Sequence, residues 1–269
     1  MKDITDRDIH SMEAFAFSTR FSDADPEPDP MVREYWKKGY LRLSGLFSPG
    51  EIVAWSAECD RLLSLDLVNP DNIRTQFRMN SGDLPERIDP VVDISPFFTA
   101  LVRDPRIVDR VAAIFRDKPL LFKDKLIFKA PGTLGYSMHQ DQAYWQLCPA
   151  DDILSISLQI DGANAENGCI ELFPGYHGRM LTPVGKRTNF REEELALVDP
   201  AVGEKIETKP GDVLIFHSLA PHQSGTNVAN VSRRSLYLTY SAARSGDFYE
   251  EQKKNYLDYA AELGQGHFK

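Results

Sequence analysis

The second half of this chain consists of short apolar runs bounded by turn-forming residues, and this pattern restricts the possible folds more than any other feature. Gly, Pro and Asn gather between the runs, which are five to ten residues long. The runs are Leu120–Lys129, Ile153–Ile160, Cys169–Phe173, Val213–His217 and Ser235–Tyr240. Short strands at close spacing predict an antiparallel barrel or sandwich, so we expect a mainly β fold.

The first half predicts helices that brace this sheet. Ser or Asp followed by Pro marks a helix start, because the side chain caps the first turn and proline is tolerated at the first helical position. Ser48-Pro49 adds Glu51, which completes a capping box. The expected elements are a helix from Met31 to Lys38, a strand over 40–44, a helix from Pro49 to about Ser64, helices beginning at Pro96 and Pro105, and a helical tail after Asp247.

The chain is expected to have two parts. Residues 1–30 end in an acidic, proline-rich stretch that cannot form a regular helix, so they predict an arm or linker. Residues 31–269 are then one barrel domain. Within it, the polar residues 178–205 are either a lid over the mouth of the barrel or a solvated excursion without a role.

Composition limits the partners and the compartment. A net charge of -9 and a sequence pI near 5.2 argue against nucleic acid or an anionic membrane surface. The three cysteines have no C-x-x-C spacing, which indicates reduced thiols rather than a disulfide framework. Because no apolar run approaches the ~18 residues of a membrane span, we expect a cytoplasmic protein. We also expect a small-molecule substrate. An oligomer is compatible with the sequence.

His139 and Asp141 are the first candidate metal ligands. Side chains two residues apart leave one face of a strand together, and two such ligands with a distant histidine make the 2-His-1-carboxylate arrangement that binds Fe(II) and leaves coordination positions open. A chance His-x-Asp is unsurprising in a chain with six histidines. Two histidines compete for the third position: His222 follows a strand end in a polar segment, whereas His217 ends an apolar run and is the better structural residue.

Cationic residues near these ligands have two interpretations each. Lys123, Lys125 and Lys129 share one face of the expected strand 120–129. Such a face is usually solvated; alternatively, one lysine points into the barrel and meets an anionic substrate. Arg233 follows His222 by eleven residues, and a guanidinium suits the far carboxylate of a dicarboxylic co-substrate. Arg234 is its neighbouring competitor.

Together these features resemble the phytanoyl-CoA dioxygenase family of Fe(II)/2-oxoglutarate oxygenases. The resemblance spans roughly residues 31–245 in the right order. The matching segments are Gly39–Glu51, His139-Gln-Asp141 with Tyr144-Trp145, Glu166–His177, Pro210–His217, and His222-x-Ser224-x-x-Asn227 with Arg233.

The resemblance implies a double-stranded β-helix (jelly-roll, cupin-like) barrel with flanking helices, and a hydroxylase that uses iron, 2-oxoglutarate and oxygen. It assigns iron to His139, Asp141 and His222. It assigns 2-oxoglutarate to four residues: Arg233, Ser224, Ser157 and Lys125. Because related halogenases lack the carboxylate, Asp141 implies hydroxylation or a related oxidation.

The substrate is less constrained, because one fold serves many substrates. Residues that could contact it are Tyr144, Trp145, Lys123, Asn227, Arg74 and Arg78. The family branch with the most similar motifs hydroxylates small organophosphonates at the carbon next to phosphorus, so 2-aminoethylphosphonate is the predicted substrate. The alternatives are an amino acid or other small zwitterion and, with less support, an acyl-CoA. A catalytically inactive cupin-like binding protein and an oxygen-independent metal isomerase or hydrolase are the alternatives outside the oxygenase class.

Overall fold

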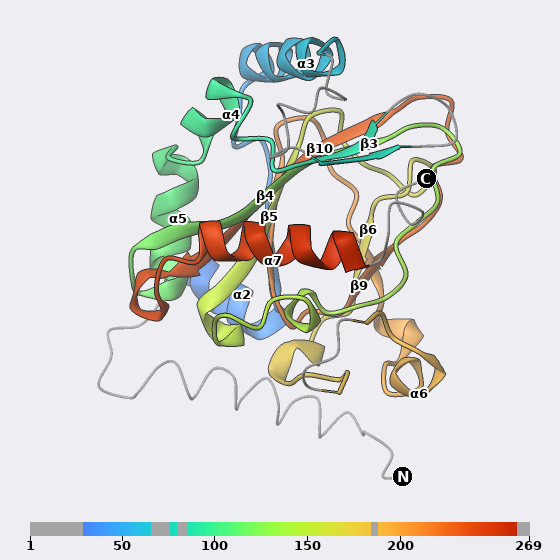
Figure 1. The fold of residues 1–269 in the computed structure, drawn as a ribbon. Coiled ribbons are helices and arrows are strands. Elements are labelled where there is room, and N and C mark those ends of the chain that lie inside the picture. Colours follow the sequence, from blue (N-terminus) through green and yellow to red (C-terminus); the bar gives the residue numbers. More distant parts are fainter. Residues whose placement is uncertain (1–28, 66–75, 80–84, 184–187, 263–269) are drawn as a thin grey trace.

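The computed structural model describes residues 29–262, except for the segments 66–75, 80–84 and 184–187. Two antiparallel sheets form its centre (Figure 1). The larger sheet has the order β1-β8-β5-β10-β4-β3-β2, and the smaller one the order β7-β6-β9. Their strands are β1 (Tyr40–Leu43), β2 (Gln76–Met79), β3 (Pro85–Asp89), β4 (Pro119–Lys129), β5 (Ile153–Gln159), β6 (Ile170–Leu172), β7 (Glu204–Lys205), β8 (Val213–His217), β9 (His222–Ser224) and β10 (Arg233–Ala242).

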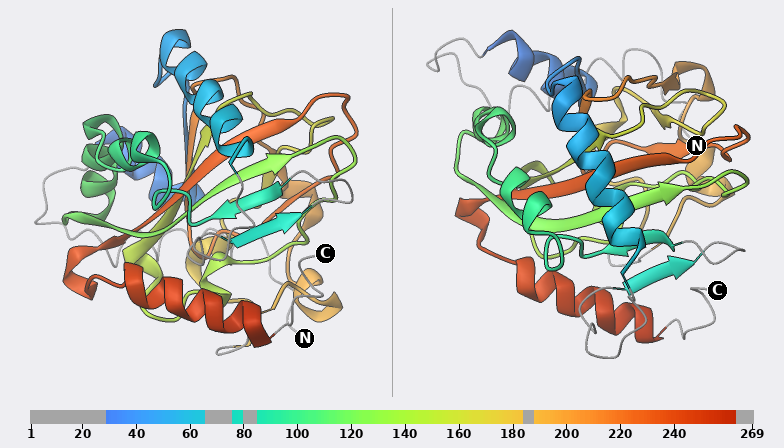
Figure 2. Two further views of the ribbon diagram at one scale, coloured as in Figure 1. Left: turned by 45° about the horizontal axis from the view of Figure 1, so that its top comes forward. Right: turned by 90° about the horizontal axis from the view of Figure 1, so that it is seen from above.

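Helices flank the larger sheet, as the sequence predicts. The helices are α2 (Pro30–Lys38), α3 (Pro49–Leu63), α4 (Pro96–Leu101), α5 (Pro105–Phe115), α6 (Glu192–Leu195) and α7 (Tyr249–Glu262). The first four each begin with proline after a capping Asp or Ser, and Ser48 forms the predicted capping box with Glu51. Figure 2 shows, in its left panel, the larger sheet between α3 and α7. No helix in the described ranges is long and apolar enough to cross a bilayer.

The five apolar runs are all strands, and the larger sheet separates the main apolar core from an interior that is polar along β5. Every residue of β5 is buried. Because side chains alternate along a strand, Leu154 and Ile156 join the main apolar core with residues of α2–α5, while Ser155 and Ser157 form hydrogen bonds on the other face. β5, which is buried on both faces, thus gives its side of the barrel a polar lining, whereas residues of β6 and β8 form an apolar cluster of their own. The predicted arm, residues 1–30, lies outside the described residues apart from Asp29 and Pro30, which start α2.

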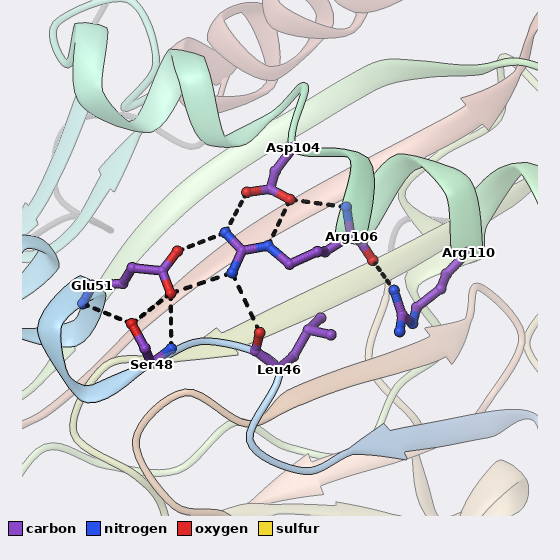
Figure 3. A network of polar contacts seen from close by, with 6 residues as sticks. All are labelled: Leu46, Ser48, Glu51, Asp104, Arg106 and Arg110. Atoms are coloured by element: carbon purple, nitrogen blue, oxygen red, sulfur yellow. Dashed lines mark hydrogen bonds and ion pairs between the residues drawn. The ribbon is translucent and has the colours of Figure 1, made fainter.

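A polar network fastens the start of α3 to the start of α5 (Figure 3). The guanidinium of Arg106 lies 2.6 Å from carboxylate oxygens of both Glu51 and Asp104. Its Cζ is 4.2 Å from the centre of the Phe47 ring. The hydrogen bond from Arg106 is the main reason that the pKa of Glu51 falls to about 2, and it also lowers the pKa of Asp104.

We expect Arg106→Met to lower the free energy of unfolding at pH 7 by about 1 kcal/mol, since the network is partly exposed to solvent. Both carboxyl pKa values are lower in the folded protein, so this stabilisation is complete above their ordinary values and is lost as the pH falls towards 2. Urea unfolding at pH 7 and at pH 3 measures the difference. Arg110→Met is the matched control, because in the network drawn Arg110 donates only to the Arg106 carbonyl. A stability difference that does not change with pH would contradict the prediction.

Candidate active site

Three potential metal ligands converge where the two sheets meet. The ligand atoms of His139, Asp141 and His222 all lie within 4.8 Å of one another. Asp141 Oδ1 is 3.7 Å from His139 Nε2 and 3.9 Å from His222 Nε2. Backbone hydrogen bonds in both directions join His139 to His222, at the start of β9, and therefore fix the two imidazoles side by side.

The local geometry differs from the strand that we expected for His-x-Asp. His139 forms only an isolated bridge, and Asp141 opens a 3-10 turn, Asp141–Ala143. The carboxylate therefore reaches the histidines through a turn rather than through strand alternation. Ser155 on β5 supports it by donating from Oγ to Asp141 Oδ2 over 3.1 Å.

The protonation states suit a divalent cation. Nδ1 of His139 lies 2.8 Å from the Ser137 carbonyl and Nδ1 of His222 lies 3.0 Å from the Ala220 carbonyl. These carbonyls require the proton on Nδ1 and so leave each Nε2 lone pair for a metal. Burial, followed by the neighbouring His139, lowers the pKa of His222 to about 4. Burial alone would raise the pKa of Asp141, but the adjacent imidazoles and Lys125 hold it below its usual range. Two neutral imidazoles and one carboxylate are the donor set that fits Fe(II).

The competing histidine has structural contacts instead. His217 is 1% exposed, and its Nδ1 accepts a hydrogen bond from the Leu219 N–H. Its ring centre lies 5.5 Å from those of Trp36 and His177. The structure thus brings His222, and not His217, to His139 and Asp141.

A narrow cavity of about 50 Å³ adjoins the two histidines and contains the predicted co-substrate residues Arg233, Ser224 and Lys125. Arg233 is 3% exposed, and Nη1 donates to Ser235 Oγ at 3.3 Å. Its Nε is buried without a hydrogen-bond partner. A buried, unsatisfied guanidinium donor is costly, so this cavity fits a carboxylate.

The remaining co-substrate candidates have other positions. Ser157 is not among the residues lining the cavity. It accepts from Gln159, which accepts from Ser235, so Ser157 lies at the far end of a hydrogen-bond chain that orients Arg233. Arg234 is fully engaged elsewhere, with Nε and Nη2 both donating to the carboxylate of Asp161.

A wider cavity of about 260 Å³ opens on the other side of His139 and Asp141. The predicted residues Lys123, Tyr144 and Trp145 line it, and Lys125 borders both cavities. The lysine face of β4 is therefore not solvated; it lines the barrel, because the sheet closes over it. Lys129 on the same face is 0% exposed.

Three other residues that were predicted to contact the substrate are not among the described residues that line this cavity. Asn227 is buried, and its side-chain amide donates to the carbonyls of Lys129 and Val231, so it closes a loop rather than facing substrate. Arg74 lies outside the described residues, as does the side chain of Arg78.

Several residues that line the wider cavity were not predicted from the sequence. Arg87 comes from β3, Tyr136 from the segment before His139, and Asn189 from the segment 178–205. Gln252, Asn255 and Tyr256 come from α7. Of these residues, only Asn189 could have been found from the sequence, because the lid interpretation places part of 178–205 at the barrel mouth. Asn189 Oδ1 accepts a hydrogen bond from the Tyr144 hydroxyl at 2.8 Å.

The wider cavity is cationic. Lys123 and Arg87 share the buried carboxylate of Asp89, at 2.6 Å and 3.5 Å respectively. Lys125 has no hydrogen-bond or ion-pair partner in the part of the chain that the structure describes, and its ammonium lies 5.1 Å from the centre of the Tyr237 ring. Three cationic side chains face two carboxylates, Asp89 and Asp141, so the cavity favours a further anionic ligand beside the three potential metal ligands.

The comparisons with known proteins agree with this geometry. A sequence profile of the family described as phytanoyl-CoA dioxygenase (PhyH) matches residues 35–235. Methylphosphonate hydroxylase of Gimesia maris is 29% identical over 83% of this chain and 84% of its own length. A 2-aminoethylphosphonate dioxygenase from an uncultured bacterium, HF130_AEPn_1, is 25% identical over 63% of this chain and 65% of its own.

Among solved structures, EctD from S. alaskensis with 2-oxoglutarate and 5-hydroxyectoine is similar with a TM-score of 0.71. It is 20% identical and covers 84% of this chain and 79% of its own. The fold is thus the predicted double-stranded β-helix with flanking helices.

Proposed function

This chain belongs to the phytanoyl-CoA dioxygenase family of Fe(II)- and 2-oxoglutarate-dependent oxygenases, and we propose that it hydroxylates a small organophosphonate at the carbon next to phosphorus. In this class of reaction, iron supplies the activation of oxygen. One oxygen atom enters succinate, with loss of carbon dioxide from 2-oxoglutarate, and the other enters the substrate.

The protein residues then divide between two adjoining cavities. His139, Asp141 and His222 bind iron between them, and Arg233, with Ser224, binds the far carboxylate of 2-oxoglutarate in the narrow cavity. The substrate occupies the wider cavity, where Asp141 and His139 form the wall nearest the metal.

One observation carries the choice of substrate: Arg87, Lys123 and Lys125 line the wider cavity together. A fully ionised phosphonate is a dianion with three acceptor oxygens, so two or more cationic or amide donors would suit it. The Asp141 carboxylate attracts Lys125, but no described residue forms a hydrogen bond or ion pair with its ammonium, which leaves it available for this group. A cavity of about 260 Å³ suits a small molecule.

The reaction is tested with methylphosphonate and 2-aminoethylphosphonate, the substrates named for two relatives. The Fe(II)-loaded protein is given 2-oxoglutarate and oxygen, succinate is measured, and phosphorus NMR follows the phosphonate. We expect one succinate per hydroxylated phosphonate. For methylphosphonate, the product signal should be that of hydroxymethylphosphonate.

Methanesulfonate is the matched control, because it has the shape of methylphosphonate but one negative charge fewer. We expect its turnover to be at least about tenfold lower, since one charge-assisted hydrogen bond contributes about 1.5–3 kcal/mol. Slow succinate release with both phosphonates intact would keep the oxygenase but exclude this substrate class. Turnover of a small zwitterion, such as an amino acid or ectoine, would make that molecule the substrate in place of an organophosphonate.

A further inference from the structure

Gln252 is a buried polar side chain on the wall of the wider cavity. It belongs to α7 and is 6% exposed. Its backbone N–H donates to the Phe248 carbonyl, as in any helix, but its side-chain amide has no hydrogen-bond partner among the residues that the structure describes. An amide buried without a partner is costly, and the large majority of buried side-chain polar atoms are hydrogen-bonded. A ligand in this cavity would supply the missing partner.

Contacts on both sides of Gln252 hold α7 against β4 (Figure 1). The Tyr249 hydroxyl donates to Asp124 Oδ2 at 2.8 Å, and Asp124 is 1% exposed. Lys253 Nζ lies 3.4 Å from the carboxylate of Asp93. Because these contacts fix the helix just before and just after Gln252, the direction of its side chain is fixed as well.

Gln252 lies at the cationic end of the cavity. Side chains four residues apart share one face of a helix, so Gln252 is next to Tyr256. The ammonium of Lys123 is 4.1 Å from the centre of the Tyr256 ring, and Arg87 donates from Nη2 to the Tyr256 hydroxyl. Gln252 and Lys123 also border the same small neighbouring cavity. The unpartnered amide is therefore beside two of the cations that attract an anionic ligand.

We infer that Gln252 is a specificity-determining residue, which donates a hydrogen bond from its side-chain amide to the anionic group of the substrate. Lys123 and Arg87 supply charge from the sheet, and Gln252 adds a neutral donor from α7. A neutral donor binds a further oxygen of the anion without placing another cation in the buried site. This inference rests on the proposed function, because it concerns the same anionic substrate.

The test measures methylphosphonate binding by calorimetric titration of the protein loaded with Fe(II) and 2-oxoglutarate, without oxygen. For Gln252→Leu, which removes the amide but keeps an apolar side chain of similar size, we expect methylphosphonate to bind at least about tenfold more weakly, as for loss of one hydrogen bond to a charged group. For Gln252→Glu we expect a loss of at least about 100-fold, because a like charge would face the phosphonate. The affinity for 2-oxoglutarate should change less than about threefold in both variants.

Lys254→Gln is the matched control, because it changes the net charge by the same amount as Gln252→Glu and on the same helix. The side chain of Lys254 is 74% exposed and pairs with Asp258. We expect its replacement to change the methylphosphonate affinity by less than about twofold. Equal losses in Lys254→Gln and Gln252→Glu would mean that net charge alone causes the effect, and the inference would be wrong.

Titration with 2-aminoethylphosphonate identifies the end of the substrate that the amide meets. Gln252→Glu should weaken the binding of this phosphonate too; tighter binding would show that the side chain faces the ammonium end and would contradict the inference. A merely structural glutamine would weaken 2-oxoglutarate and methylphosphonate by the same factor, which would also overturn it. If the unaltered protein bound neither phosphonate, the proposed function itself would fail. If it bound them and Gln252→Leu changed nothing, only the role of Gln252 would be lost.

Discussion

His222→Gln is expected to lower substrate-dependent succinate formation by more than about 100-fold and to remove stoichiometric Fe(II) binding. The neutral Nε2 of His222 faces Asp141 at 3.9 Å, and in the described structure only His139 and Asp141 group with it as potential ligands. Changing only the outer hydrogen-bond partners of a metal ligand costs 10–100-fold, so loss of a ligand should cost more. Iron content after gel filtration and the rate of succinate release measure the two effects.

His217→Gln is the matched control for this substitution. His217 is also a buried histidine five residues away along the chain, but it packs with Trp36 and accepts from the Leu219 N–H. Its replacement should lower the free energy of unfolding while most bound iron is retained. If His217→Gln lost the iron and His222→Gln kept it, the third ligand would be His217 rather than His222.

Local signals in the sequence predicted much of this fold. The pairs Ser48-Pro49, Ser95-Pro96 and Asp104-Pro105 each start a helix, because capping and the fixed proline backbone act within one turn. The apolar runs form strands for a similar reason, because the alternation of side chains along a strand is a local property of the sequence. The pairing of β2 with β3 was not predicted. The short strands β7 and β9 were not predicted either, because they depend on partners distant in the chain.

The candidate site was predictable where a motif carried it and not where closure of the barrel decided it. His139, Asp141, His222 and Arg233 converge as their resemblance to a family implied. The lysine face of β4 was wrongly favoured as solvated, since strand alternation fixes which residues share a face but not which face the barrel encloses. Arg87 contacts Tyr256 across 169 positions, and no local pattern signals such a contact.

The charge of the two cavities cannot be predicted from the composition of the whole chain. The chain has a net charge of -9, yet four buried or partly buried cations line the two cavities beside the three potential metal ligands. They are Arg87, Lys123, Lys125 and Arg233. Such a concentration costs stability in the free protein, and two anionic reactants, 2-oxoglutarate and a phosphonate, would relieve it.

Arg233→Gln is expected to raise the 2-oxoglutarate concentration needed for half-maximal activity by about 100-fold. Its guanidinium is 3% exposed, and its Nε has no partner, so a far carboxylate would gain a buried, charge-assisted contact. Truncating one partner of such a pair costs about 2–5 kcal/mol, and about 2.7 kcal/mol corresponds to 100-fold. Succinate release at increasing 2-oxoglutarate measures the change.

Arg234→Gln separates this effect from a general loss of arginine at the start of β10. Arg234 donates from Nε and Nη2 to Asp161 and from Nη2 to Ser56 Oγ, away from the narrow cavity. Its replacement should leave the 2-oxoglutarate requirement within about twofold and lower the free energy of unfolding by about 1–2 kcal/mol, because a paired, partly buried carboxylate loses its partner. An unchanged requirement in Arg233→Gln, together with a strong increase in Arg234→Gln, would transfer the co-substrate contact to Arg234. Since the two residues are adjacent on one strand and point to opposite faces, the pair tests the side of the sheet on which 2-oxoglutarate binds.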